Sequence, residues 1–175
     1  NRIIYTLPFT SVIDQNFSVF EEVLGDLAND SSVLLKHHYL TRKEYKTNEA
    51  EVYEYDISKY LIENWDSEIV VTTFVQMINS IFSNKNKNLK KYHNLANSII
   101  ILDEVQSIPY KYWKLVNNTL KKMSETLNCY IILVTATMPL IFDESKNEII
   151  ELATDKKDYF SYFNRIDLDV SLLKN

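Results

Sequence analysis

Residues 98–106 contain the sequence feature that most constrains the fold, an unbroken apolar run followed at once by two acids. Ile99 to Leu102 are four consecutive apolar residues without polar alternation, a pattern typical of a strand buried on both faces in a parallel sheet. Asp103 and Glu104 then stand at the carboxyl end of this strand. Because ligands of open α/β sheets bind outside the carboxyl ends of the strands, the run predicts a polar site at that edge.

The two acids have two interpretations. A carboxylate at a strand end holds Mg²⁺ in nucleotide hydrolases, which suits Asp103. A second carboxylate beside it can act as general base for an attacking water, which suits Glu104. In the alternative interpretation the acids begin a surface loop and form its polar rim, because short motif matches carry a high false-positive risk. The rest of the sequence has to discriminate between the two.

Strand-like and helix-like segments alternate along the rest of the chain. The expected strands are residues 2–6, 33–35, 68–72, 98–102 and 129–134. The expected helices are residues 13–27, 48–65, 73–81, 110–127 and 148–153. We expect Thr10 or Ser11 to cap the first helix, Asn48 and Glu51 to form a capping pair for the second, and residues 84–88 to form a hydrophilic loop. This alternation predicts an α/β fold with a mainly parallel, doubly wound sheet.

Composition limits the functional classes. The chain has 175 residues, a net charge of −5 and 46% hydrophobic residues, which suits one globular domain without bulk attraction to nucleic acid. No apolar run approaches the roughly 18 residues that span a bilayer. We therefore expect no membrane partner. The N-terminus has neither a starting Met nor a secretory signal, so we expect a chain cut from a longer one. The single Cys129 excludes a disulfide framework and a cysteine-rich zinc site, so we expect a reduced, cytoplasmic setting.

Gly25 is the only glycine of the sequence. The G-x-x-x-x-G-K-[ST] and G-x-G-x-x-G loops that cradle phosphates each need at least two glycines, so neither occurs in these residues.

Polar clusters follow four of the expected strands. They are residues 6–10 (TLPFT), 72–76 (TTFVQ), 103–106 (DEVQ) and 135–139 (TATMP). Each threonine cluster alone is explained by helix capping. Because parallel strands end at the same edge of a sheet, we expect all four clusters to share one rim.

With these clusters, the chain resembles the first RecA-like lobe of superfamily-two helicases, and more narrowly the CRISPR-associated type I helicase family. The motifs that carry the resemblance are residues 5–11 (YTLPFTS), 63–66 (ENWD), 70–76 (VVTTFVQ) and 102–106 (LDEVQ). It covers residues 2–139, with residues 140–175 as the C-terminal part of the same lobe. It implies a three-layer RecA-like (P-loop NTPase-type) domain with a mainly parallel sheet that lacks the phosphate-loop strand.

The resemblance also implies roles for individual residues. Asp103 would hold the Mg²⁺ of MgATP, Glu104 would orient and deprotonate the attacking water, and Gln106 would report the nucleotide state. Thr135, Ala136 and Thr137 would couple that state to the nucleic-acid surface. Pro8, Thr10, Thr72, Thr73 and Gln76 match motifs that hold one strand of nucleic acid. Hydroxyls, amides and helix N-termini bind phosphates without net positive charge, which agrees with the acidic composition.

The implied activity is ATP-dependent unwinding of target DNA for degradation in type I CRISPR antiviral defence. The implied partners are single-stranded DNA, the CRISPR surveillance complex and a His-Asp nuclease domain outside this chain. The sequence contains no phosphate-binding loop, no second lobe and no His-Asp pair. We therefore expect that this polypeptide alone neither binds ATP at micromolar concentration nor unwinds DNA. The missing phosphate-loop strand would also leave residues 130–134 with an unpaired, apolar edge.

Two other functions remain open. The chain could belong to another superfamily-two helicase that acts on a different duplex, RNA included. It could also be a non-catalytic signalling α/β domain in which Asp103 is modified. That class needs an acidic pair after its first strand and a lysine at the end of a late one, whereas residues 6–8 and 135–137 occupy those places here.

Overall fold

The computed structural model describes residues 2–38, 45–47, 55–137, 141–142 and 148–153. Within them, parallel strands form one five-stranded sheet in the order β2-β3-β1-β4-β5. The strands are β1 (Arg2–Leu7), β2 (Leu34–His37), β3 (Ile69–Thr73), β4 (Ser98–Asp103) and β5 (Tyr130–Val134). The helices are α1 (Ile13–Leu24), α2 (Tyr55–Asn64), α3 (Phe74–Phe82), α4 (Asn86–Leu89) and α5 (Trp113–Leu127). The predicted α/β fold with a parallel sheet is thus confirmed.

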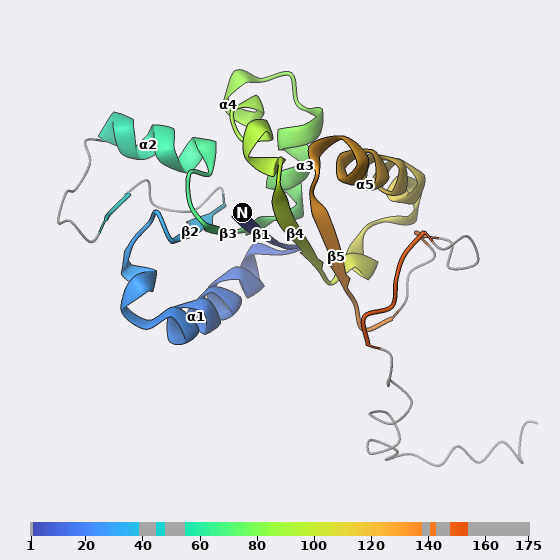
Figure 1. The fold of residues 1–175 in the computed structure, drawn as a ribbon, viewed down its shortest axis with the longest axis horizontal. Helices are drawn as coiled ribbons and strands as arrows, with labels where there is room; N and C mark the ends of the chain where they lie inside the picture. Colours follow the sequence, from blue (N-terminus) through green and yellow to red (C-terminus); the bar gives the residue numbers. More distant parts are fainter. Residues whose placement is uncertain (1, 39–44, 48–54, 138–140, 143–147, 154–175) are drawn as a thin grey trace, which may run out of the picture. The chain divides into compact units, whose positions relative to one another are not determined.

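Helices lie on both sides of the sheet, α1 on one side and α3 and α5 on the other (Figure 1). The apolar residues of α1 recur every three or four positions, so one stripe of the helix faces the sheet. Ile13 of this stripe packs in a core with Leu7, Leu34 and Val71. This core covers one face of β1, β2 and β3, and α3 packs on β1 and β3 from the other side (Figure 1).

β4 does not have two equally buried faces, contrary to the prediction. Ile100 and Leu102 are buried, whereas Ile99 and Ile101 on the other face are only half-buried. The reason is that α1 packs on the strands to one side of β4 and leaves this face of β4 less covered. A continuous apolar run predicts burial, but only the position of the helices decides which face receives it.

β5 lies at the edge of the sheet and, among the described residues, pairs with β4 alone. Its end residues Tyr130 and Val134 are 72% and 44% exposed. The prediction of an unpaired edge at residues 130–134 is confirmed for the described part of the chain.

Several helix boundaries differ from the sequence prediction. Neither Thr10 nor Ser11 caps α1: they lie in a 3-10 turn (Thr10–Val12), and the cap position Val12 makes no side-chain bond. α2 begins at Tyr55 in the described residues, and the predicted capping pair at 48 and 51 lies outside them.

Other segments also differ. The expected hydrophilic loop overlaps the short helix α4, and α5 is preceded by a 3-10 turn at Tyr110–Tyr112. The helix expected at 148–153 is wrong, since these residues are described and are not helical. Residues 148–153 lack the apolar residues at every third or fourth position that the correctly predicted helices have.

The chain divides into two compact units, residues 1–141 and 142–175. The first unit contains the sheet and its helices. In the second unit, Phe142 and residues 148–153 are described and form no regular element. None of the helices in the described ranges has the length and apolar character needed to pass through a bilayer.

Candidate functional site

The four predicted polar clusters follow strands that end at the same edge of the sheet. Leu7 pairs with Thr73, and Asp103 pairs with Val134, so parallel neighbours end at matching positions. Asp103 and Thr135 therefore lie at the same end of the sheet. The described residues thus meet the condition that the two acids and the threonine clusters share one rim.

Asp103 is held by hydrogen bonds to both carboxylate oxygens. Its Oδ1 accepts a bond of 2.9 Å from the backbone N–H of Glu104, and its Oδ2 accepts a bond from the hydroxyl of Tyr5. Burial, followed by the bond to Asp103, raises the pKa of Tyr5 well above its ordinary value. Tyr5 therefore stays protonated and acts as a donor across the physiological pH range.

Glu104 adopts a left-handed backbone conformation, with φ 55° and ψ 40°. This conformation costs a non-glycine residue roughly 1–2 kcal/mol. It ends β4 abruptly and is followed by a tight 3-10 turn, in which Ser107 N–H donates to the Glu104 carbonyl at 2.9 Å. The side chain of Glu104 is exposed and is not packed into the core. Such strain is concentrated at functional sites, where it fixes the direction of a side chain.

Gln106 connects the acid pair to the end of β5. Its side-chain Nε2 donates to Glu104 Oε2, and its Oε1 accepts a bond of 2.5 Å from the hydroxyl of Thr135. The Thr135 hydroxyl is also 2.6 Å from the carbonyl of Thr137, so its single proton has two acceptors in reach. A movement of the Glu104 side chain can therefore be transmitted through the side-chain amide of Gln106 to residues 135–137. Ala136 is exposed between these two threonines.

Thr72 and Thr73 are used differently, although their sequence resembles that of the 135–137 segment. Thr72 is fully buried, and its hydroxyl donates to the carbonyl of His37 at 2.7 Å. The Thr73 hydroxyl caps α3 by accepting from Gln76 N–H at 3.2 Å. Both hydroxyls make hydrogen bonds within the fold. The helix-capping explanation for a threonine cluster is confirmed at Thr73.

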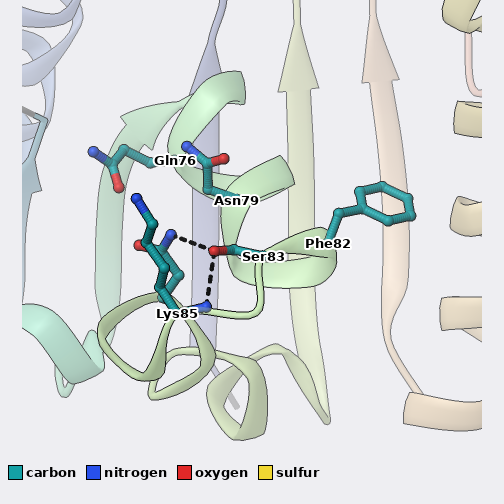
Figure 2. A pocket seen from close by; sticks show the side chains of 6 residues that line it. Gln76, Asn79, Phe82, Ser83 and Lys85 are labelled. Atoms are coloured by element: carbon teal, nitrogen blue, oxygen red, sulfur yellow. Dashed lines mark hydrogen bonds between the residues drawn. The ribbon is translucent and has the colours of Figure 1, made fainter.

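Pro8, Thr10 and Gln76 are partly exposed near the ends of β1 and β3. Gln76 lines a hollow of about 370 Å³ that runs along α3 (Figure 2). The other lining residues are Asn79, Phe82, Ser83, Lys85 and Asn88. Ser83 Oγ accepts bonds from Lys85 N–H at 3.1 Å and from Asn88 Nδ2 at 2.9 Å. The hollow is polar and does not include the acid pair.

The oxygen atoms at the rim suit a hard divalent cation. Mg²⁺ is typically held by one or two carboxylates together with substrate phosphates rather than by an all-protein cage. Asp103 and Glu104 supply such carboxylates, and no group of three or more His, Cys, Asp or Glu side chains with metal-binding geometry occurs among the described residues. The donor set therefore fits Mg²⁺ that arrives with a nucleotide.

The fold and this site define a RecA-like α/β domain. The family model for the DEAD/DEAH box helicase matches residues 1–144, and the chain therefore belongs to that family.

Narrower similarities point to CRISPR-associated helicases. The chain is 30% identical over 161 residues to the CRISPR-associated nuclease/helicase Cas3 of Haloferax volcanii, a match that covers 87% of this chain and 17% of the relative. The crystal structure of T. fusca Cas3-ATP has a similar fold, with a TM-score of 0.58 and 19% identity over 78% of this chain and 15% of that chain. The chain thus spans less than a fifth of either relative. The resemblance to a segment of a type I CRISPR helicase, drawn from the motifs, is confirmed.

Sequence reasoning missed two polar contacts. Tyr5 was not identified as a partner of Asp103, because the order of the strands is needed to know that β1 and β4 are neighbours. Trp65 donates from Nε1 to His37 Nδ1 at 2.8 Å, a contact between residues 28 positions apart. Neither contact has a signal in residue spacing.

Proposed function

We propose that the chain is part of the first RecA-like lobe of an ATP-dependent DNA helicase in type I CRISPR defence. The observation that carries this proposal is the continuous connection from Glu104 through Gln106 to Thr135 at the carboxyl rim. A carboxylate that senses the γ-phosphate and a segment that responds to it need such a link. An acid pair at the start of an ordinary surface loop does not.

Asp103 and Glu104 would form the nucleotide site. Asp103 would hold Mg²⁺, which when bound with ATP neutralises charge on the β- and γ-phosphates. Glu104, exposed and aimed by its left-handed backbone, would orient the attacking water and accept its proton. Gln106 holds one Glu104 oxygen and thereby limits the directions in which the carboxylate can face.

Thr135, Ala136 and Thr137 would couple hydrolysis to the nucleic-acid surface. Thr135 can donate to Gln106 or to the Thr137 carbonyl, but not to both with one proton. A nucleotide-dependent movement of Gln106 would therefore shift this hydrogen bond. The 135–137 segment would change its conformation in step with the nucleotide state.

Single-stranded DNA would lie over the segments that contain Pro8, Thr10, Thr72, Thr73 and Gln76. Thr10 and Gln76 are the partly exposed polar side chains of this group, and we assign them the contacts with phosphates. Thr72 and Thr73 would support these segments from inside the fold, since their hydroxyls are bonded there.

Activity would require parts beyond these residues. The sequence has no glycine-rich phosphate loop, so a phosphate-binding segment and a second lobe would come from elsewhere in the full-length protein. The CRISPR surveillance complex and a His-Asp nuclease domain would be its partners in the cell interior. Residues 1–141 would form the lobe proper, with residues 142–175 as its C-terminal part.

The test is ATP hydrolysis by the full-length protein, with single-stranded DNA or RNA as stimulating ligand. We expect stimulation by DNA, and a loss of roughly 100-fold or more in the hydrolysis rate for Glu104→Gln, because general-base catalysis contributes about that much. Nucleotide binding by Glu104→Gln should be retained. Hydrolysis by Glu104→Gln within threefold of the wild-type rate would contradict the proposal, and stimulation by RNA alone would favour another superfamily-two helicase.

A further inference from the structure

Tyr5 reaches Asp103 because of the register between two neighbouring strands. Tyr5 of β1 pairs with Ile101 of β4, and Asp103 lies two residues beyond Ile101 on the same face of the sheet. The Tyr5 side chain therefore extends along that face towards the strand end and donates its hydroxyl proton to Asp103 Oδ2. Asn16 Oδ1 also lies 3.3 Å from the hydroxyl, a longer and weaker contact.

The Tyr5 ring is itself held in place. It packs edge-to-face against Phe20 of α1, with ring centroids 5.4 Å apart. Tyr5 also belongs to the residues packed against the core of Leu7, Ile13, Leu34 and Val71. The hydroxyl is thus presented to Asp103 by a side chain fixed in the well-packed half of the sheet.

The two hydrogen bonds on Asp103 fix its carboxylate plane. Glu104 N–H occupies one side of Oδ1, and Tyr5 occupies one side of Oδ2. A carboxylate oxygen has two acceptor sites, so each oxygen retains one for a further partner. Without Tyr5, the bond from the adjacent backbone would be the only one left on Asp103 from the described residues, and the carboxylate could rotate.

We propose that Tyr5 is a positioning residue that orients Asp103 for divalent-metal binding and thereby joins the metal site to the strand that leads into Pro8 and Thr10. This inference rests on the proposed function, because it needs Asp103 to be a metal ligand. Partners that orient a metal ligand typically change metal affinity about 10- to 100-fold when they are removed. Tyr5 does not contact the reacting atoms and acts through Asp103 only.

The test uses Tyr5→Phe in the full-length protein, which removes the hydroxyl and retains the ring that packs on Phe20. The matched control is Tyr45→Phe, since Tyr45 is 3% exposed and its hydroxyl donates to the Asp66 carbonyl at 2.6 Å, away from the acid pair. Binding of Mn²⁺ in the presence of a non-hydrolysable ATP analogue is measured by electron paramagnetic resonance. Affinity for the analogue in EDTA is measured separately.

We expect Tyr5→Phe to weaken Mn²⁺ binding about tenfold, at the lower end of the range for such partners, and to leave metal-free nucleotide affinity unchanged. Tyr45→Phe should match the wild type in both measurements. The Tyr5→Phe hydrolysis rate should recover at high Mg²⁺, because a misoriented ligand is still a ligand. Mn²⁺ affinity of Tyr5→Phe within twofold of wild type, or a lowered rate that excess Mg²⁺ does not restore, would overturn the inference.

Asp103→Asn separates this inference from the proposed function. If Asp103→Asn loses Mn²⁺ binding and Tyr5→Phe does not, the role of Tyr5 is wrong and the proposed function stands. If Asp103→Asn binds Mn²⁺ like the wild type, Asp103 is not the metal ligand and both fail.

Discussion

The two halves of the sheet are built from similar residues but are organised for different purposes. β2, β3 and β1 share one core with α1, and polar groups such as Thr72 and Trp65 make their hydrogen bonds inside this half. β4 and β5 have a half-buried face and an open edge, and their carboxyl ends present Glu104 and Thr135. At the end of β3, the Thr72 hydroxyl bonds to the neighbouring strand β2 and the Thr73 hydroxyl caps α3, whereas after β5 the half-buried Thr135 hydroxyl bonds to Gln106 at the rim. The comparison teaches that burial, rather than residue type, separates a threonine hydroxyl bonded inside the fold from one bonded at the rim of the sheet.

The largest effect on stability is expected in the packed half. Trp65 is fully buried, so Trp65→Ala should destabilise this half by about 3–5 kcal/mol through the cavity it leaves. Trp65→Phe, which mainly loses the bond to His37, should cost about 1 kcal/mol. Hydrogen exchange of the β2 and β3 peptides, followed by mass spectrometry of the full-length protein, measures both. Equal hydrogen exchange in Trp65→Ala and the wild type would contradict the claim that Trp65 stabilises this half of the sheet.

A matched pair of substitutions compares the two threonine clusters directly. Thr72→Val should destabilise β2–β3 pairing by about 1 kcal/mol, because the hydroxyl bond to the His37 carbonyl is lost. Thr135→Val should leave exchange protection unchanged within about 0.5 kcal/mol, since the residue is half-buried at the rim.

The same pair is expected to show the opposite order in DNA-stimulated ATP hydrolysis. Thr135→Val removes the donor to Gln106 and should uncouple hydrolysis from DNA, while Thr72→Val should retain the stimulation. Uncoupling by both variants would place both threonines in one functional group.

Glu104 gives a third test, in which stability and activity are expected to change in opposite directions. Glycine adopts the left-handed conformation without steric cost, so Glu104→Gly should stabilise the β4 end by about 1 kcal/mol while abolishing hydrolysis. Thermal unfolding and hydrolysis are measured on the same preparation. A destabilised Glu104→Gly would show that the left-handed backbone is not strained.

The smallest expected effect concerns Cys129, next to β5. The residue is 5% exposed, and burial raises the pKa of its thiol. At a given pH near 8 fewer molecules carry the thiolate, so alkylation should be slower than in unfolded protein by about tenfold or more. Peptide mass spectrometry after timed alkylation, with and without urea, reads this out. Fast alkylation of the folded protein would mean that the solvent-exposed edge of the sheet extends to the amino end of β5.

The sequence by itself determined the parallel α/β fold and the position of the acid pair. Both follow from local patterns: apolar runs such as 99–102, helices with a three-four repeat, and polar residues directly after each strand. Where the local pattern was weak, as at 148–153, the predicted helix does not form. Capping of α3 by Thr73 was predictable in kind because an N-cap acts within three residues of itself.

The tertiary structure alone decided which residues meet across the sheet. The bond from Tyr5 to Asp103 joins residues 98 positions apart, and it requires β1 and β4 to be neighbours in a defined register. The half-buried face of β4 and the internal use of the Thr72 hydroxyl likewise depend on where α1 and β2 pack. Hydrogen bonds and burial act through space, so spacing along the chain predicts the elements and their ends, and only their packing selects the partners.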